Sequence, residues 1–304
     1  MSLLNLTNDG KRGVLVAIYR LLLGEKSMER ERLLALCAPD GLSDKKHTRE
    51  TLNTWVELGL FERSEDDRIS IQPVMSSKER REEFLPQFAR QRVLAEENNR
   101  RFWEVEKSRS ADFTRAVGWL LAQDVYEAEY ASWDTVEAAI KRQTPQNESF
   151  FGKNDTRWNG LKAWAPFLGF AWTSKYPRSG ALIVDPTDAF RDALPEIFGK
   201  RVTLATDEFL AALADALPVL DNGRYRRQVE DKLGEHKGVD AWIAPPDGQL
   251  STSLSRALLR LLSEGTLRGE KRADAPKRAR LTGRNRAVID EYSHFSFKPT
   301  RASS

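Results

Sequence analysis

Residues 51–61 read TLNTWVELGLF, an amphipathic helical pattern that ends at Leu58-Gly59 and leads into a strand. A charged turn at residues 64–67 follows, and then a second apolar stretch, ISI, at residues 69–71. Glycine is a common stop after a helix, and two apolar stretches around a polar turn are typical of a hairpin. Helical patterns at residues 11–24 and 28–37 precede this segment. Three helices followed by a hairpin predict a winged helix.

The same order occurs twice more along the chain. Residues 161–171 read LKAWAPFLGFA, and a turn at residues 176–180 leads to a strand at residues 182–184. Residues 258–267 read LLRLLSEGTL, and we expect residues 279–282 to form the returning strand. Gly59, Gly169 and Gly265 stand at the three helix stops, and Trp164 takes the place of Trp55. Three such modules fit the 304 residues of the chain.

The predicted fold class is therefore mainly α, with tandem winged-helix domains (helix-turn-helix plus β-hairpin) joined by helices. Residues 78–107 contain no glycine and only Pro86 as a breaker, which predicts one long connecting helix. The predicted division is a first winged helix at 1–77, the connecting helix at 78–108, a second winged helix at 109–200, a third with a basic wing at 201–298, and a disordered tail at 299–304.

Positive charge is concentrated in one part of the chain. Eight basic and two acidic residues lie between Arg268 and Arg286, a net charge of 8 − 2 = +6, whereas the whole chain carries +3. The remaining residues therefore sum to −3. The third wing is the region expected to attract a polyanion.

Several classes of function lack their signatures. A single cysteine excludes an internal disulfide or a cysteine-based zinc site, and three scattered histidines argue against a metal centre. The phosphate-loop, dinucleotide-binding, HExxH and GxSxG motifs do not occur. We expect no catalytic activity, no cofactor and no metal. The sequence shows neither a signal-peptide pattern nor 18 consecutive apolar residues, so we expect a cytoplasmic protein without membrane contact.

In the first module, the helical pattern places Lys46, Arg49 and Asn53 away from the apolar stripe. Arginine can read guanine and asparagine can read adenine in the major groove. The wing of this module carries Glu65, Asp66 and Asp67, which would repel a phosphate backbone. DNA contact and protein contact both remain open for this module.

The second module combines basic and aromatic residues, a mixture typical of nucleic-acid surfaces. The candidates for DNA contact are Arg157 and Lys162 on the helix and Arg178 on the wing. Trp164 and Trp172 are expected in the core, while Trp158 could belong to either the core or the surface.

The third module has the largest candidate set. At the start and outer face of its helix we expect Ser253, Arg256 and Arg260. Its wing carries Arg268, Lys271, Arg272, Lys277, Arg278, Arg280 and Arg284. A solvated charged loop is the alternative. If about five or six of these residues contacted phosphates, log affinity would fall against log salt with a slope of roughly −5.

The first 75 residues or so resemble a known family. The segments Leu3-Leu4-Asn5-Leu6, Leu36-Cys37-Ala38-Pro39 and Leu52-Asn53-Thr54-Trp55 are similar to those of DpdG-like accessory proteins, which belong to bacterial islands that insert deazapurine bases into DNA. The resemblance implies a working partner in a multi-protein defence or DNA-modification assembly. It carries over no catalytic residues.

Together these patterns favour a non-catalytic DNA-binding and scaffolding subunit that holds duplex mainly by phosphate contacts. Phosphate contacts position a protein without reading bases, so we expect low sequence specificity. The expected partners are double-stranded DNA and other subunits of the system, and a homodimer remains open. The alternatives are a winged-helix transcriptional regulator, which predicts a dimer on a specific site, and a protein-only adaptor.

Overall fold

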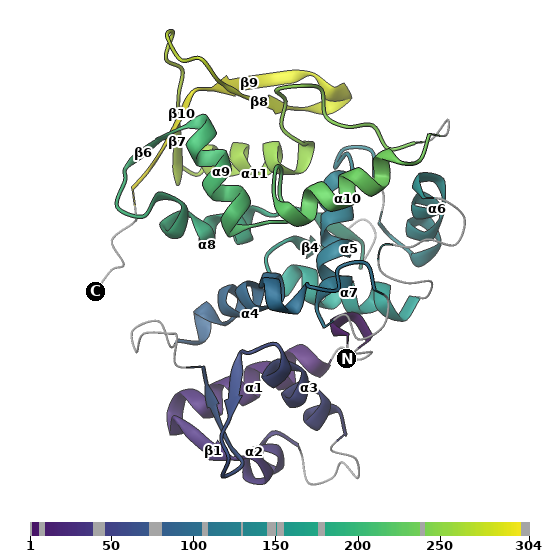
Figure 1. The fold of residues 1–304 in the computed structure, drawn as a ribbon, viewed down its shortest axis with the longest axis vertical. Coiled ribbons are helices and arrows are strands. Elements are labelled where there is room, and N and C mark those ends of the chain that lie inside the picture. Colours follow the sequence, from purple (N-terminus) through teal and green to yellow (C-terminus); the bar gives the residue numbers. More distant parts are fainter. Residues whose placement is uncertain are drawn as a thin grey trace. The chain divides into compact units, whose positions relative to one another are not determined.

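The structure, a computed structural model, describes residues 2–5, 10–38, 46–72, 81–104, 109–128, 130–144, 150, 155–175, 180–237 and 241–298. The chain forms two compact units, each built from two stretches of sequence. Unit 1 comprises residues 1–114 and 151–168, and unit 2 comprises residues 115–150 and 169–304. The described residues mix α and β structure, with helices predominating over small antiparallel sheets (Figure 1).

The first part of unit 1 is a helical module with a three-stranded sheet. Its elements are α1 (Gly10–Glu25), β1 (Ser27–Glu29), α2 (Arg30–Cys37), α3 (Lys46–Glu57), β2 (Phe61–Arg63) and β3 (Arg68–Ile71). The strand order is β1-β3-β2, and Ile69 of β3 is paired with Met28. Leu52 and Trp55 of α3 and Ile69 are fully buried, which confirms the predicted apolar stripe and hairpin.

The glycine stops predicted from the repeats are confirmed. Gly59, Gly169 and Gly265 have φ values of +79°, +80° and +72°, a left-handed conformation that costs glycine little. At the first stop, the Leu60 amide donates to the Trp55 carbonyl at 2.9 Å, the six-to-one hydrogen bond of a Schellman motif.

The predicted long helix at 78–107 is wrong. The described part of this range contains α4 (Leu85–Leu94), flanked by 3-10 turns at Glu82–Phe84 and Glu96–Asn98, while residues 73–80 and 105–108 lie outside the description. The side-chain amides of Asn98 and Asn99 donate at 2.8 Å to the carbonyls of Arg92 and Val93, respectively. The carbonyls at the end of a helix have no hydrogen-bond donor within the helix, and these side-chain bonds supply one. The two asparagines therefore end α4 without glycine or proline.

The rest of unit 1 centres on α7 (Asp155–Phe167) and the first turn of α5 (Ala111–Ala122). Trp164 of α7 is buried against Trp55, with ring centroids 5.3 Å apart. The chain start packs on the same helix: a Cβ at Gly160 would lie 2.9 Å from the Leu4 carbonyl oxygen. The two tryptophans that the repeat aligned in sequence are therefore neighbours in one core.

Unit 2 contains the rest of α5, further helices and three small antiparallel β-structures. The helices are α6 (Trp133–Gln143), α8 (Thr187–Phe198), α9 (Thr206–Ala216), α10 (Arg224–Gly234) and α11 (Thr252–Ser263). The strands form a β4 (Ala171–Thr173) and β5 (Leu182–Val184) hairpin, a β8 (Ala279–Thr282) and β9 (Val288–Tyr292) hairpin, and a sheet of order β6-β10-β7, made by β6 (Thr203–Ala205), β10 (His294–Phe297) and β7 (Leu267–Glu270).

Residues 279–282 form a strand as predicted, but their predicted pairing is wrong. They pair with β9, whereas the strand that returns onto β7 is β10, with Phe295 opposite Gly269. Phe295 and Phe297 are buried on alternate positions, and their burial fixes β10 in the sheet. With α10 and residues 271–293 set aside as insertions, the order α8-β6-α9-α11-β7-β10 and the sheet order β6-β10-β7 match the first module.

Candidate nucleic-acid interface

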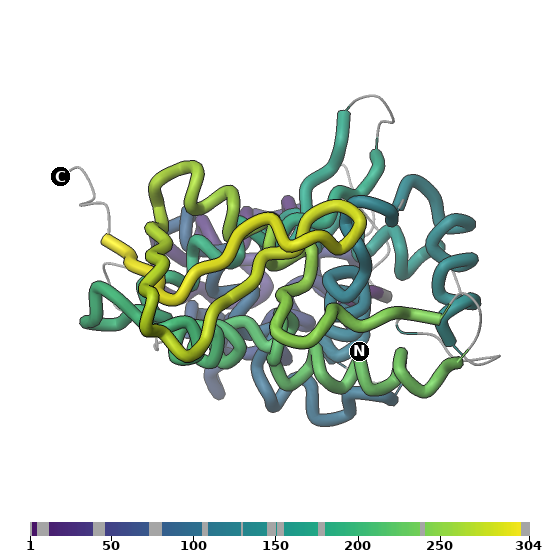
Figure 2. The backbone as a smooth tube through the Cα atoms, turned by 90° about the horizontal axis from the view of Figure 1, so that it is seen from above, coloured from purple at the N-terminus to yellow at the C-terminus, as the bar shows by residue number. Residues whose placement is uncertain are grey.

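The basic stretch of the third module folds back on itself as an arm. We define the basic arm as residues 268–292, which run from β7 through β8 and return along β9 (Figure 1). In Figure 2 the yellow tube follows the arm out and back as one long hairpin. Leu281 of β8 is buried, while Arg280 next to it points to solvent. The strand period of two thus places Arg280, the basic residue of β8, on the outer face.

Carboxylates hold five of the cations of the basic arm. Arg278 and Arg280 both pair with Glu291, and Lys271 lies 2.6 Å from Asp290. Arg272 pairs with Glu270 at 2.8 Å, and Lys277 lies 3.9 Å from Asp207 of α9. The strand that pairs with β8 therefore brings two acids to the cations, and the net charge of residues 268–292 is 8 − 4 = +4.

The ionisation of this cluster reflects these contacts. The hydrogen bond from Arg272 holds the pKa of Glu270 below its usual value. Burial alone would raise the pKa of Asp290, but hydrogen bonds from Lys271 and Tyr292 outweigh it and lower that pKa. Burial and the bond to Asp290 raise the pKa of Tyr292 to about 12. Glu270 and Asp290 are thus charged at neutral pH and compete with a phosphate for the same cations.

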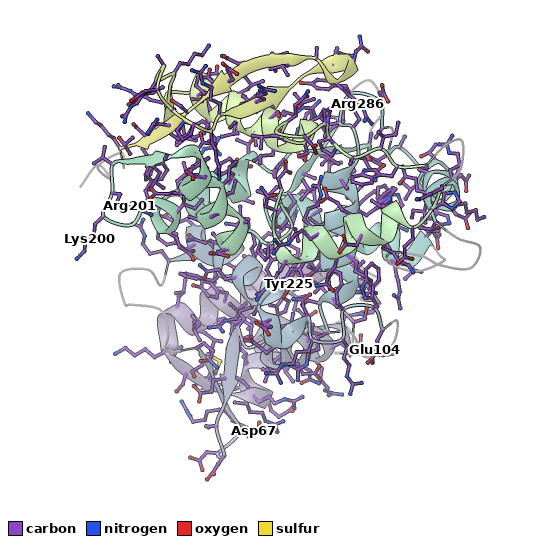
Figure 3. All side chains as sticks on the ribbon, turned by 45° about the horizontal axis from the view of Figure 1, so that its top comes forward. Asp67, Glu104, Lys200, Arg201, Tyr225 and Arg286 are labelled. Atoms are coloured by element: carbon purple, nitrogen blue, oxygen red, sulfur yellow. The ribbon has the colours of Figure 1, made fainter. Side chains whose placement is uncertain are left out.

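Other cations of the basic arm have no carboxylate partner among the described ion pairs. Arg268 is exposed on β7. Arg284 lies over the ring of Tyr126, with 5.1 Å from its guanidinium carbon to the ring centroid. Arg286, labelled in Figure 3 near the turn between β8 and β9, donates to the carbonyls of Ile243 and Ala244 at 3.3 Å. Surface ion pairs contribute little, so phosphates can exchange with the paired carboxylates as well.

The predicted outer face of α11 is used inside unit 2. Ser253 is fully buried, and its hydroxyl donates to the Leu121 carbonyl at 2.7 Å. Arg256 donates to the carbonyls of Val125 and Val184. Arg260 is half exposed but lies 2.6 Å from the buried carboxylate of Asp185. The side chains at the start of α11 are therefore not accessible to DNA bases, and the predicted exposure of Ser253 is wrong.

The candidate residues of the first module are mostly exposed to solvent. Lys46 and Arg49 are exposed on α3, and Asn53 is half-buried and accepts a 3.5 Å hydrogen bond from Arg30. At the turn between β2 and β3, Asp67 pairs with Arg63 at 2.6 Å (Figure 3). Glu65 next to this pair is exposed, so the turn presents negative charge to solvent.

The candidate residues of the second module do not form one surface. Arg157 is buried with its guanidinium 4.0 Å from Asp112, so it is not accessible for the DNA contact predicted for it. Lys162 is half-buried, 5.9 Å from the centroid of Trp158, which is itself in the core. Trp172 was expected in the core but is 44% exposed on β4. Arg178 lies outside the described residues.

The sequence analysis did not identify the acidic and aromatic residues that pair with the candidate cations. Asp290 and Glu291 lie four and five residues beyond Arg286, so a charge window that continued past Arg286 would have included them. Asp185 and Tyr126 are far from their partners Arg260 and Arg284 in sequence and gave no signal.

No group of three or more His, Cys, Asp or Glu side chains in the described ranges is placed to hold a metal ion. Nor does any helix within those ranges have the length and apolar character to cross a membrane.

Comparison with known proteins connects the chain to one family. A family model described as DpdG-like matches residues 1–275, which extends the resemblance of the first 75 residues or so over most of the chain. Searches among curated proteins and among solved structures find no match.

Proposed function

We propose that this chain, which belongs to the DpdG-like family, is a non-catalytic DNA-binding and scaffolding subunit of the deazapurine DNA-modification system. Membership of the family suggests a role in that system. The basic arm is the part of the molecule that we assign to DNA.

The observation that carries the DNA assignment is the exposed, net positive basic arm. Arg268, Lys277, Arg280 and Arg284 are exposed, and the basic arm keeps four positive charges after its own acids are counted. Duplex DNA carries closely spaced phosphates, and neutralising them releases condensed counterions. A two-stranded arm of this charge suits the backbone of a duplex.

We further propose that residues 10–71 and the α8 to β10 segment are winged helices. The shared helix and strand order and the matching sheet orders β1-β3-β2 and β6-β10-β7 support this assignment. In the second of these segments the polar side of α11 is occupied by bonds within unit 2. DNA contact there would come from the basic arm alone, which favours phosphate contacts and low sequence specificity.

The scaffolding part of the proposal rests on the first module. The turn between β2 and β3 carries Glu65, Asp66 and Asp67, and only Asp67 has an ion-pair partner among the described contacts of these three. An acidic hairpin turn repels DNA and favours a basic protein surface. The exposed Lys46 and Arg49 on α3 support the alternative of a transcriptional regulator, which would need two copies on a specific site.

The test is fluorescence anisotropy with a labelled random-sequence duplex at fixed salt. The variant Arg268→Gln, Lys277→Gln, Arg280→Gln removes three exposed charges of the basic arm without placing new acids beside Glu270 or Glu291. The matched control, Arg32→Gln, Arg100→Gln, Lys141→Gln, removes three exposed charges elsewhere.

The proposal predicts that the arm variant loses roughly 30- to 1,000-fold in affinity, because each of the three phosphate contacts contributes roughly three- to tenfold. The control variant should bind nearly as the native protein does. Equal losses in the two variants would mean that only overall charge matters and would overturn the assignment. Binding to one sequence alone, by a dimer, would favour the regulator.

A further inference from the structure

A pocket in unit 2 has the size and lining of a small-molecule site. Its volume is about 530 Å³, and its walls come from the end of α5, the following turn, α6 and residues 241–243. Ligand sites in proteins span roughly 300 to 1,000 Å³. Arg286 of the basic arm also lines the pocket, so the pocket opens next to the turn between β8 and β9.

One aromatic side chain of the pocket offers a stacking surface, and a second offers a hydroxyl group. The indole of Trp242 is half-buried, and its Nε1 donates to the Ala122 carbonyl at 2.8 Å, which fixes the ring. Tyr130 is 5% exposed, and its hydroxyl has no hydrogen-bond partner within the described structure. A buried hydroxyl without a partner is costly, so a polar ligand that reached it would be favoured.

A ring of hydrogen bonds orients two amides on the pocket wall. The Trp119 indole donates to Oε1 of Gln143 at 2.9 Å, Nε2 of Gln143 donates to Oε1 of Gln123 at 2.7 Å, and Nε2 of Gln123 donates to the Trp119 carbonyl at 3.1 Å. Each amide has one further N–H and one further lone pair. Fixed donors and acceptors side by side match the edge of a nucleobase, as in the pairing of glutamine with adenine.

The charged groups of the pocket are balanced. Asp124 and Glu127 can accept hydrogen bonds from an exocyclic amine, and Arg142 and Arg286 can donate to a phosphate. A ligand with an amino-bearing flat ring and an anionic group has a partner for each part.

We propose that this pocket binds the base of a nucleotide that carries an exocyclic amino group. The base stacks on Trp242, its edge meets Gln123 and Gln143, and its phosphate lies toward Arg142. The nucleotide is either free or an unstacked residue of a DNA strand. The site stands on its own residues and does not depend on the basic arm holding duplex.

The first experiment is equilibrium dialysis of the full chain with AMP, CMP and UMP. AMP and CMP should bind, and UMP, which lacks the amino group, should bind at least fivefold more weakly. Trp242→Ala should lower AMP affinity roughly 5- to 150-fold, the range measured for loss of base stacking. Trp172→Ala removes an exposed tryptophan of the same unit that does not line the pocket, and it should bind as the native chain does.

Two further measurements distinguish a loss of binding from misfolding, and a free nucleotide from an unstacked base of a DNA strand. Arg142→Gln should weaken AMP but leave adenosine unchanged, a difference that misfolding would not produce. A duplex with one unpaired adenine is compared by anisotropy with its fully paired form, using native chain and Trp242→Ala. A preference for the unpaired adenine that Trp242→Ala abolishes supports a strand base, and free AMP binding alone supports a free nucleotide. Absence of both, or equal binding of AMP and UMP, would overturn the proposal, even if paired duplex binds through the basic arm.

Discussion

The guanidinium of Arg260 on α11 lies 2.6 Å from the carboxylate of Asp185, whose side chain is 3% exposed. The other oxygen of Asp185 accepts a 3.1 Å hydrogen bond from the Thr187 amide at the start of α8. Arg260 therefore compensates a buried charge that begins a helix. A cation that looks available for DNA in the sequence has a structural role in unit 2.

Arg260→Gln is expected to destabilise the protein by about 1–2 kcal/mol, because it leaves the Asp185 carboxylate without its cation while the half-exposed site limits the loss. Arg268→Gln, on β7, should stay within about 0.5 kcal/mol of the native stability. Urea unfolding gives both values. Duplex affinity should show the opposite order: Arg268→Gln weakens binding roughly three- to tenfold, and Arg260→Gln leaves it nearly unchanged. A reversed order would return α11 to the DNA interface.

Glu291→Gln is expected to tighten DNA binding. The substitution frees Arg278 and Arg280 from their shared carboxylate and raises the charge of the basic arm by one. Affinity for random duplex should rise roughly three- to eightfold. The control Glu137→Gln removes a carboxylate of equal exposure that pairs with Lys141 on α6, and it should have little effect. Unchanged or weaker binding by Glu291→Gln would contradict the role of the basic arm.

Trp164→Ala should strongly destabilise unit 1. Trp164 is 2% exposed and packs on Trp55, so its removal leaves a large cavity. Losses of about 3–5 kcal/mol are typical of such substitutions. Trp103→Ala, at a 43% exposed position of the same unit, serves as the control and should cost less than about 1 kcal/mol. Similar stabilities for the two variants would show that the pair of tryptophans is not central to this core.

Tyr292 makes the unfolding free energy of the protein depend on pH in the alkaline range. Its pKa of about 12 in the folded protein lies above the ordinary value of 10.0, owing to burial and to the bond to Asp290. The contribution of the protonated Tyr292 side chain to the stability of the folded protein is therefore complete below pH 10, and it is lost as the pH rises toward 12. The difference in unfolding free energy between the native protein and Tyr292→Phe should therefore shrink over this interval. A difference that is constant or grows there would contradict the bond between Tyr292 and Asp290.

The parts of the fold that the sequence predicts well are those with a strong local signal. The helix stops at Gly59, Gly169 and Gly265 and the Ile69 strand are of this kind, because a positive φ and a buried alternation are local demands. Strands β1 and β6 escaped prediction, since three residues between two helices are too few to show a period of two. Their pairing with β3 and β10 is decided by tertiary contacts.

The candidate interface was predictable in charge but not in accessibility. The count of cations between Arg268 and Arg286 comes from the sequence alone, and the structure folds this stretch into the basic arm. Which of these cations are held by acids depends on the register of β8 with β9, which places Arg280 opposite Glu291. Ser253 and Arg157 were misplaced because their partners, Leu121 and Asp112, come from segments that only the fold brings near.

The salt dependence of duplex binding tests the central claim most directly. Anisotropy from about 50 to 300 mM salt should give a slope near −4 for log affinity against log salt. The four net positive charges of the basic arm neutralise about four phosphates, and each phosphate contributes about −0.9 to the slope. The slope should become about three units shallower in the Arg268→Gln, Lys277→Gln, Arg280→Gln variant. A native slope shallower than about −1, or a slope that the variant leaves unchanged, would contradict DNA binding through the basic arm.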